Sequence, residues 1–156
     1  MQLAILILED EPEVRDALER DLAPIAGDVR IEVADTVEDA WDVVSEVDED
    51  GDILALVLAD HRLPGKTGVD FLVEMNDDDR TALTRKVLVT GQADQDDTIR
   101  ALNQAKLDHY FSKPWDVEKL LGVVRDQLTD YVLDLDIDPL PYLRVLDGVR
   151  VMEALR

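Results

Sequence analysis

Acidic side chains directly follow two apolar runs of the sequence. Glu9 and Asp10 come after Leu3–Leu8, and Asp60 comes after Ile53–Ala59. Apolar runs of this length predict strands that are buried on both faces. If the two strands lie in one parallel sheet, their carboxylates meet at the same edge, where mutual repulsion calls for a cation. Mg²⁺ prefers carboxylate oxygens in proteins, so the pattern predicts a magnesium site.

A hydroxyl and an ammonium group are expected at the same edge. Thr90 ends a third apolar run, and Lys113 follows the short segment His109–Ser112, which is predicted to be the last strand. Transfer of a phosphoryl group requires positioning and charge stabilisation, which a metal, a lysine and hydrogen-bond donors supply. An aspartate can act as the nucleophile and form an aspartyl phosphate. Because the chain has 37 acidic residues, any one of these acids alone would be assigned to the solvated surface, and the set carries the prediction.

The apolar pattern alternates between short runs and helical periodicity. The predicted strands are residues 3–8, 29–33, 53–59, 87–90 and 109–112. The predicted helices are residues 12–25, 37–47 after an N-cap at Thr36, 69–75, 94–104 and 116–132. This alternation predicts an α/β doubly wound domain with a mainly parallel sheet and right-handed crossovers. In such a sheet the functional crevice lies beyond the carboxyl ends of the strands.

Four blocks of sequence, in this order, resemble the receiver domain of bacterial response regulators. They read LILEDEPEVRDAL, LVLADHRLPGKTGVDFL, VLVTGQAD and HYFSKPW. The resemblance covers residues 1–133 and identifies this segment as a CheY-like receiver domain of a two-component system. It implies a flavodoxin-like (βα)5 fold with a five-stranded parallel sheet in the order 2-1-3-4-5.

The resemblance also implies a role for each acid. Asp60 would be the phosphoacceptor, Asp10 a direct Mg²⁺ ligand and Glu9 an indirect ligand through water. The backbone carbonyl of Arg62 would complete the protein ligands together with Asp60. The family often has Asp where this chain has Glu9, and metal binding is expected to survive that change.

The remaining implied roles concern the switch that follows phosphorylation. Thr90 would hydrogen-bond the phosphoryl group, Lys113 would pair with it, and Tyr110 would turn inward. Taken singly, Thr90 could be a strand-end cap and Tyr110 an ordinary half-buried residue. Pro114 is expected to follow a cis peptide bond. Arg62 and Gln92 occupy positions that influence the lifetime of the phosphate in this family.

Composition and charge exclude several classes of protein. The formal net charge is −21, and nucleic-acid binding depends on clustered Lys and Arg, so no nucleic-acid partner is expected. The chain contains no cysteine, which excludes disulfides and thiolate metal sites. No apolar stretch reaches the roughly 20 residues of a membrane span. We expect a cytoplasmic protein without a membrane partner.

Residues 134–156 follow the predicted receiver domain. Two prolines precede Tyr142, Leu146, Val149 and Met152, whose helical spacing predicts a short amphipathic helix. The expected role of this extension is packing against its own domain. Pairing with another chain, including a homodimer, and the start of a linker to a further domain are alternatives.

The leading functional hypothesis is a phosphorylatable receiver. Its phosphate would come from a histidine kinase or a phosphotransfer protein, and it would signal to an unknown protein target through the face formed by the fourth helix, the fifth strand and the fifth helix. An unphosphorylated pseudo-receiver that serves as a docking module is the alternative. A phosphatase with an aspartyl nucleophile needs a second carboxylate two residues further on. Arg62 occupies that position, so no enzyme activity is expected.

Overall fold

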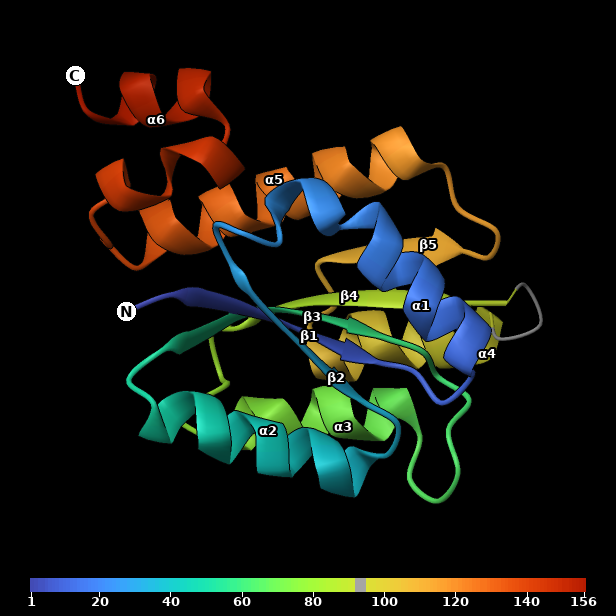
Figure 1. The fold of residues 1–156 in the computed structure, drawn as a ribbon. Helices are drawn as coiled ribbons and strands as arrows, with labels where there is room; N and C mark the ends of the chain where they lie inside the picture. The colour runs from blue at the N-terminus through green and yellow to red at the C-terminus, as the bar shows by residue number, and fades with distance from the viewer. Residues whose placement is uncertain (92–94) are drawn as a thin grey trace.

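A computed structural model describes residues 1–91 and 95–156. Its five strands form one parallel sheet in the order β2-β1-β3-β4-β5, which confirms the predicted fold (Figure 1). The strands are β1 (Leu3–Leu8), β2 (Arg30–Ala34), β3 (Ile53–Ala59), β4 (Arg85–Thr90) and β5 (His109–Ser112). The chain order reverses direction between β1 and β3, so the crevice at their carboxyl ends is the switch point of this sheet.

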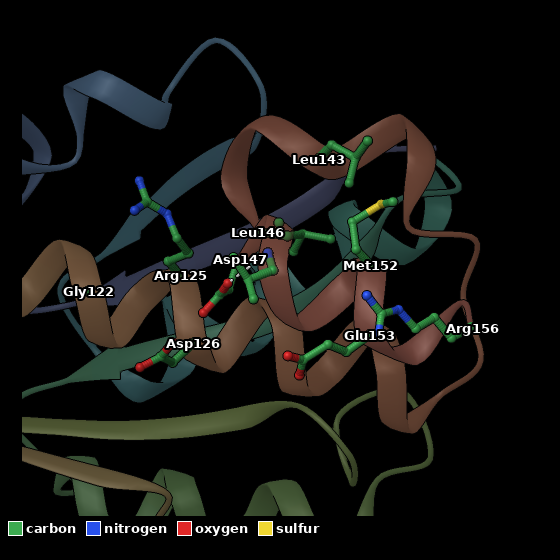
Figure 2. Close-up of a pocket in the computed structure, with 11 residues that line it drawn as sticks. Gly122, Arg125, Asp126, Leu143, Leu146, Asp147, Met152, Glu153 and Arg156 are labelled. Atoms are coloured by element: carbon green, nitrogen blue, oxygen red, sulfur yellow. Dashed lines mark hydrogen bonds between the residues drawn. The ribbon is translucent and has the colours of Figure 1, made fainter.

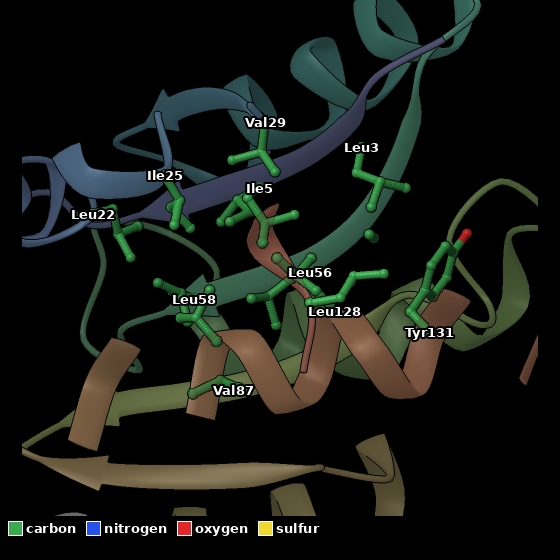
Figure 3. Close-up of a cluster of buried hydrophobic side chains, with 14 of the residues drawn as sticks. Leu3, Ile5, Leu22, Ile25, Val29, Leu56, Leu58, Val87, Leu128 and Tyr131 are labelled. Atoms are coloured by element: carbon green, nitrogen blue, oxygen red, sulfur yellow. The ribbon is translucent and has the colours of Figure 1, made fainter. Parts of the chain in front are cut away.

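Helices cover both faces of the sheet (Figure 1). They are α1 (Pro12–Asp21), α2 (Val37–Glu49), α3 (Gly68–Glu74), α4 (Gln95–Arg100), α5 (Val117–Asp134) and α6 (Gly148–Ala154). One apolar cluster joins the sheet to α1 and α5, and a second joins it to α2, α3 and the segment Ala101–Ala105 that follows α4. Figure 3 shows the first cluster, where side chains of β1 and β3 meet those of α5.

Caps fix where the helices that flank the crevice begin. The hydroxyl oxygen of Thr36 accepts a hydrogen bond from the backbone N–H of Asp39, which confirms the predicted N-cap of α2. Thr67 and Asp70 form a reciprocal capping box at the start of α3. Such caps satisfy backbone donors that the first helical turn leaves unpaired. The capping box therefore fixes the chain as it leaves the loop after β3.

The fourth helical segment differs from its prediction. The helix α4 ends at Arg100, and the chain continues as a wider π-helical turn over Ala101–Ala105 before Lys106 adopts a positive φ of 57°. Ala101 and Ala105 are both buried against the second cluster, so the wider turn keeps the small residues on the core side. The predicted start at Asp94 lies outside the described residues, as does Gln92.

The C-terminal extension is not one amphipathic helix. A 3-10 segment, Leu140–Val145, precedes α6. Asp147 lies between the two segments and is the N-cap of α6. Tyr142 and Leu146 join the first core cluster, whereas Val149 and Met152 are exposed. The prediction of a single stripe was wrong because the cap turns the chain between the buried pair and the exposed pair. The extension packs on its own domain, as expected.

Among the helices of residues 1–91 and 95–156, none is both long enough and apolar enough to span a membrane.

Candidate functional site

The three acids predicted to bind a metal lie together at the carboxyl ends of β1 and β3. One carboxylate oxygen from each of Glu9, Asp10 and Asp60 lies within 4.8 Å of the other two. The backbone holds them there: the N–H of Glu9 donates to Ala34 at 3.0 Å, and the N–H of Asp60 donates to Leu8 at 2.9 Å. Glu9 and Asp60 are only 1% and 4% exposed. The sheet ladder thus continues one residue beyond each strand and carries the acids with it.

Lys113 supplies the positive charge of the pocket. Its Nζ lies 3.1 Å from Oε2 of Glu9 and 3.3 Å from Oδ2 of Asp60. Its backbone N–H donates to the carbonyl of Thr90 at 2.9 Å, which holds the start of the loop after β5 against β4. A buried charge is stable only when paired. The ammonium therefore bridges the acids that follow β1 and β3, and it does so from the loop after β5.

The pKa of Glu9 shows that negative charge is concentrated in the pocket. Burial, followed by the charge of Asp60, raises the pKa of Glu9 to about 7, although Lys113 opposes the shift. Burial alone would lower the pKa of Lys113, but the charges of Asp60 and Glu9 outweigh it and raise that pKa. One ammonium therefore does not compensate the buried carboxylates fully. The oxygen-only donor set fits a hard divalent cation such as Mg²⁺.

The loop after Asp60 is held close to the acid by a glycine. The N–H of Gly68 donates to the carbonyl of His61 at 2.9 Å, and Gly68 starts α3. His61 is buried, whereas Arg62, whose carbonyl was predicted to bind the metal, lies in the loop with an exposed side chain. The ligand role of the Arg62 carbonyl stays a prediction.

The predicted switch residues lie on β4 and β5. Thr90 is fully buried at the end of β4. Tyr110 pairs in register with Leu88 and packs, partly buried, against the second core cluster. The peptide bond between Lys113 and Pro114 is cis. The sheet thus places Thr90 beside the pocket and Tyr110 two residues back along β5.

Two supporting contacts have no signature in the sequence. Nη1 of Arg15 donates to the carbonyl of Glu9 at 3.4 Å. Nε1 of Trp115 donates to Oδ2 of Asp21 at 2.8 Å and links the loop after Pro114 to α1. No sequence motif relates the two residues of either contact, although helical spacing places Arg15 about one turn after the start of α1. Trp115 also packs, partly buried, against the first cluster.

The model of the response regulator receiver domain matches residues 5–125 of this chain. A curated relative, the hydrogenase transcriptional regulatory protein HoxA of Cupriavidus necator, is 31% identical over 131 residues, covering 80% of this chain and 24% of HoxA. The response regulator Rre1 of Synechocystis is 29% identical over 126 residues, covering 81% of this chain and 52% of Rre1. The chain therefore spans between a quarter and about half of the length of these two relatives.

Solved structures share the fold. The receiver domain of a sensor histidine kinase from Pseudomonas aeruginosa PAO1, described with a magnesium ion in its active-site cleft, superposes with a TM-score of 0.68 at 21% identity, covering 82% of this chain and 98% of that one. At this identity the likeness concerns the fold alone. The sheet order, the acidic pocket and the family match agree, and the chain belongs to the response regulator receiver family of two-component signalling, a CheY-like signalling module.

Proposed function

We propose that this chain accepts a phosphoryl group on Asp60. The observation that carries the proposal is the cluster of Glu9, Asp10 and Asp60 within 4.8 Å, with the Nζ of Lys113 at 3.3 Å from Asp60. In this cluster Asp60 follows β3 directly, and Lys113 lies where it can neutralise added negative charge. We assign residues 1–133 to the receiver and residues 134–156 to an extension that packs on it.

The phosphoryl donor is a histidine kinase or a phosphotransfer protein. An oxygen of Asp60 forms the new P–O bond while the P–N bond to the donor's imidazole breaks, and the imidazole leaves with the electron pair. Asp10 and Asp60, the carbonyl of Arg62 and, through water, Glu9 would hold Mg²⁺. When bound, Mg²⁺ would neutralise charge on the phosphoryl oxygens.

Signalling follows from the added charge. A phosphoryl group brings about two negative charges, to which the hydroxyl of Thr90 donates and with which Lys113 pairs. Because Lys113 currently bridges Glu9 and Asp60, the loop after β5 would shift with it, and Tyr110 would turn inward beside Thr90. Ile99 and Leu102 are exposed on the helical segment next to β5, which supports a protein target at that face.

Acetyl phosphate with Mg²⁺ tests the proposal without a cognate kinase. Intact-mass measurement should show a gain of one phosphoryl group, and borohydride reduction should place it at Asp60. Asp60→Asn should show no gain. Asp79→Asn is the matched control because Asp79 is exposed and lies outside the pocket. An unchanged mass of the parent protein under saturating acetyl phosphate would favour the unphosphorylated docking module.

A further inference from the structure

A groove lies between α5 and the C-terminal extension, on the side of α5 that faces away from the sheet. It has a volume of about 840 Å³ and is lined on the extension by Leu143, Leu146, Val149, Met152 and Arg156, among others. Its other wall is formed by Gly122, Arg125 and Asp126 of α5. Figure 2 shows Leu143, Leu146 and Met152 gathered at this groove, with Arg125 and Asp126 across from them. The proposed phosphorylation pocket shares no residue with it.

The extension that forms this groove is held firmly in place. The N–H of Asp147 donates to Oγ1 of Thr129 at 2.8 Å, and Arg150 pairs with Asp130. The hydroxyl of Tyr142 donates to the carbonyl of Met1 at 3.2 Å. A face with this many anchors needs little ordering when a partner binds. The groove is therefore a preformed surface.

The outer face of α6 is apolar and uncovered. Val151 is fully buried against the core, whereas Val149 and Met152, on the other side of the helix, are 69% and 62% exposed. Leu143 and Leu155 add exposed apolar surface beside them. Contiguous exposed apolar side chains at a groove mark sites of protein association.

The charges of the groove suit a second copy of the chain. Arg125 and Arg156 line it together with Asp126, Asp147 and Glu153, whereas the whole chain has a net charge of −21. Two copies therefore repel each other over most of their surfaces, but at the groove each copy offers the other both arginines and acids.

The positions of the charges suit a twofold arrangement. Arg156 and Asp126 both line the groove. Within the part of the chain that the structure describes, neither side chain forms an ion pair. Asp126 lies by the start of α6, where its carbonyl accepts from Arg150, and Arg156 follows the helix end. Two α6 helices packed antiparallel would bring each Arg156 to the Asp126 of the other copy.

We propose that the groove between α5 and α6 is a self-association surface that joins two copies of this chain. Val149 and Met152 of the two α6 helices pack together, and Arg156 of each copy pairs with Asp126 of the other. Because α6 has only seven residues and is roughly 10 Å long, the interface is small. The dimer should dissociate in the micromolar range or above.

Sedimentation equilibrium on the unphosphorylated chain tests the charged part of the proposal. Arg156→Asp should weaken association roughly fivefold to tenfold, because it breaks two exposed pairs and creates two repulsions. The double variant Arg156→Asp with Asp126→Arg should restore it. Arg144→Asp is the control, because it changes the net charge equally at an exposed residue that does not line the groove. Equal weakening by Arg144→Asp would overturn the proposal.

The apolar part is tested in the same way. Met152→Gln should weaken association about tenfold or more, since apolar burial is lost in both copies. Leu140→Gln, which alters a similarly exposed side chain outside the groove, should leave association unchanged. Circular dichroism verifies that each variant folds. A parent chain that stays monomeric up to its solubility limit would overturn the proposal, and that result would leave the assignment of Asp60 untouched.

Discussion

Gly68 lies directly against the backbone carbonyl of Asp60. A Cβ placed on Gly68 would come within 1.8 Å of that carbonyl oxygen and 2.7 Å of the carbonyl carbon. No relaxation of a side chain can relieve such a contact, because the obstacle is backbone. The first turn of α3 can approach the phosphoacceptor position only because residue 68 lacks a side chain.

Gly68→Ala should therefore destabilise the protein by about 1–3 kcal/mol, the usual range for overpacking, and should reduce labelling by acetyl phosphate because Asp60 is displaced. Urea unfolding and intact mass measure the two effects. Gly122→Ala is the control. Nothing lies within 4 Å of a Cβ there, and inside α5 the change should stabilise by about 0.5–1 kcal/mol. Equal behaviour of the two variants would refute the steric explanation.

Mg²⁺ should stabilise the folded chain. At a concentration one hundred times the dissociation constant, a ligand that binds only the folded state adds about 2.7 kcal/mol to the free energy of unfolding. Asp10→Asn should remove most of this gain, because it deletes a carboxylate of the cluster. Asp79→Asn should retain it. Thermal unfolding with and without Mg²⁺ decides, and a gain that survives Asp10→Asn would contradict the proposed ligand set.

Trp115→Phe should cost about 1–2 kcal/mol of unfolding free energy. The change removes the indole donor from Asp21, which is 8% exposed and would lose a hydrogen bond that water cannot readily replace. Trp41→Phe is the matched control. Its indole donates to Glu74. Each acid keeps a basic partner, Arg20 for Asp21 and Lys66 for Glu74, but the side chain of Glu74 is 32% exposed against 8% for Asp21. Water can therefore replace the lost hydrogen bond more readily at Glu74, and the cost should be smaller. Equal losses in urea unfolding would show that packing, not the hydrogen bond, dominates.

Lys86→Met should stabilise the protein by about 1 kcal/mol at neutral pH, because the side chain is only 3% exposed and its ammonium is poorly solvated. Burial lowers the pKa of Lys86 below its ordinary value of 10.5. Between the lowered pKa and 10.5 the unfolded chain binds the proton more tightly, so the stability of the parent rises with pH across that window. The difference in unfolding free energy between Lys86→Met and the parent should therefore shrink as the pH rises through that window.

Unfolding curves measured from pH 7 to pH 10.5 test this prediction, and Lys119→Met, at an exposed position of α5, should show no such change. A loss of stability in Lys86→Met at neutral pH would mean that the hydrogen bond from its Nζ to the carbonyl of Thr84 outweighs the burial of charge.

Most strand bounds follow from the sequence. The predicted bounds of β1, β3 and β5 match the structure, and β2 begins and ends one residue later than predicted. In contrast, β4 begins two residues earlier than predicted, because Arg85 and Lys86 read as surface charges. In the fold Arg85 pairs with Asp108 at 3.0 Å and donates to Gln127 at 2.9 Å. Tertiary partners therefore bring charged residues into a strand, and no local pattern shows them.

The candidate site was predictable as a set of residues but not as a geometry. Order and spacing along the chain identified Glu9, Asp10, Asp60 and Lys113. The shared bridge from Lys113 to two acids depends on how the sheet brings β1, β3 and β5 together. Likewise, helical spacing grouped Tyr142 with Met152, but the cap at Asp147 separates them, and a single Asp in an apolar segment is a weak signal for such a break.

The bond between Tyr142 and Met1 lies at the far end of β1 from Glu9 (Figure 1). A strand of six residues extends about 20 Å. At that distance a unit charge contributes less than about 1 kcal/mol at an effective dielectric constant of about 20. Charge added at Asp60 would therefore act only weakly at that anchor, and a message from the phosphate to the extension would travel mainly as a movement of the chain between them.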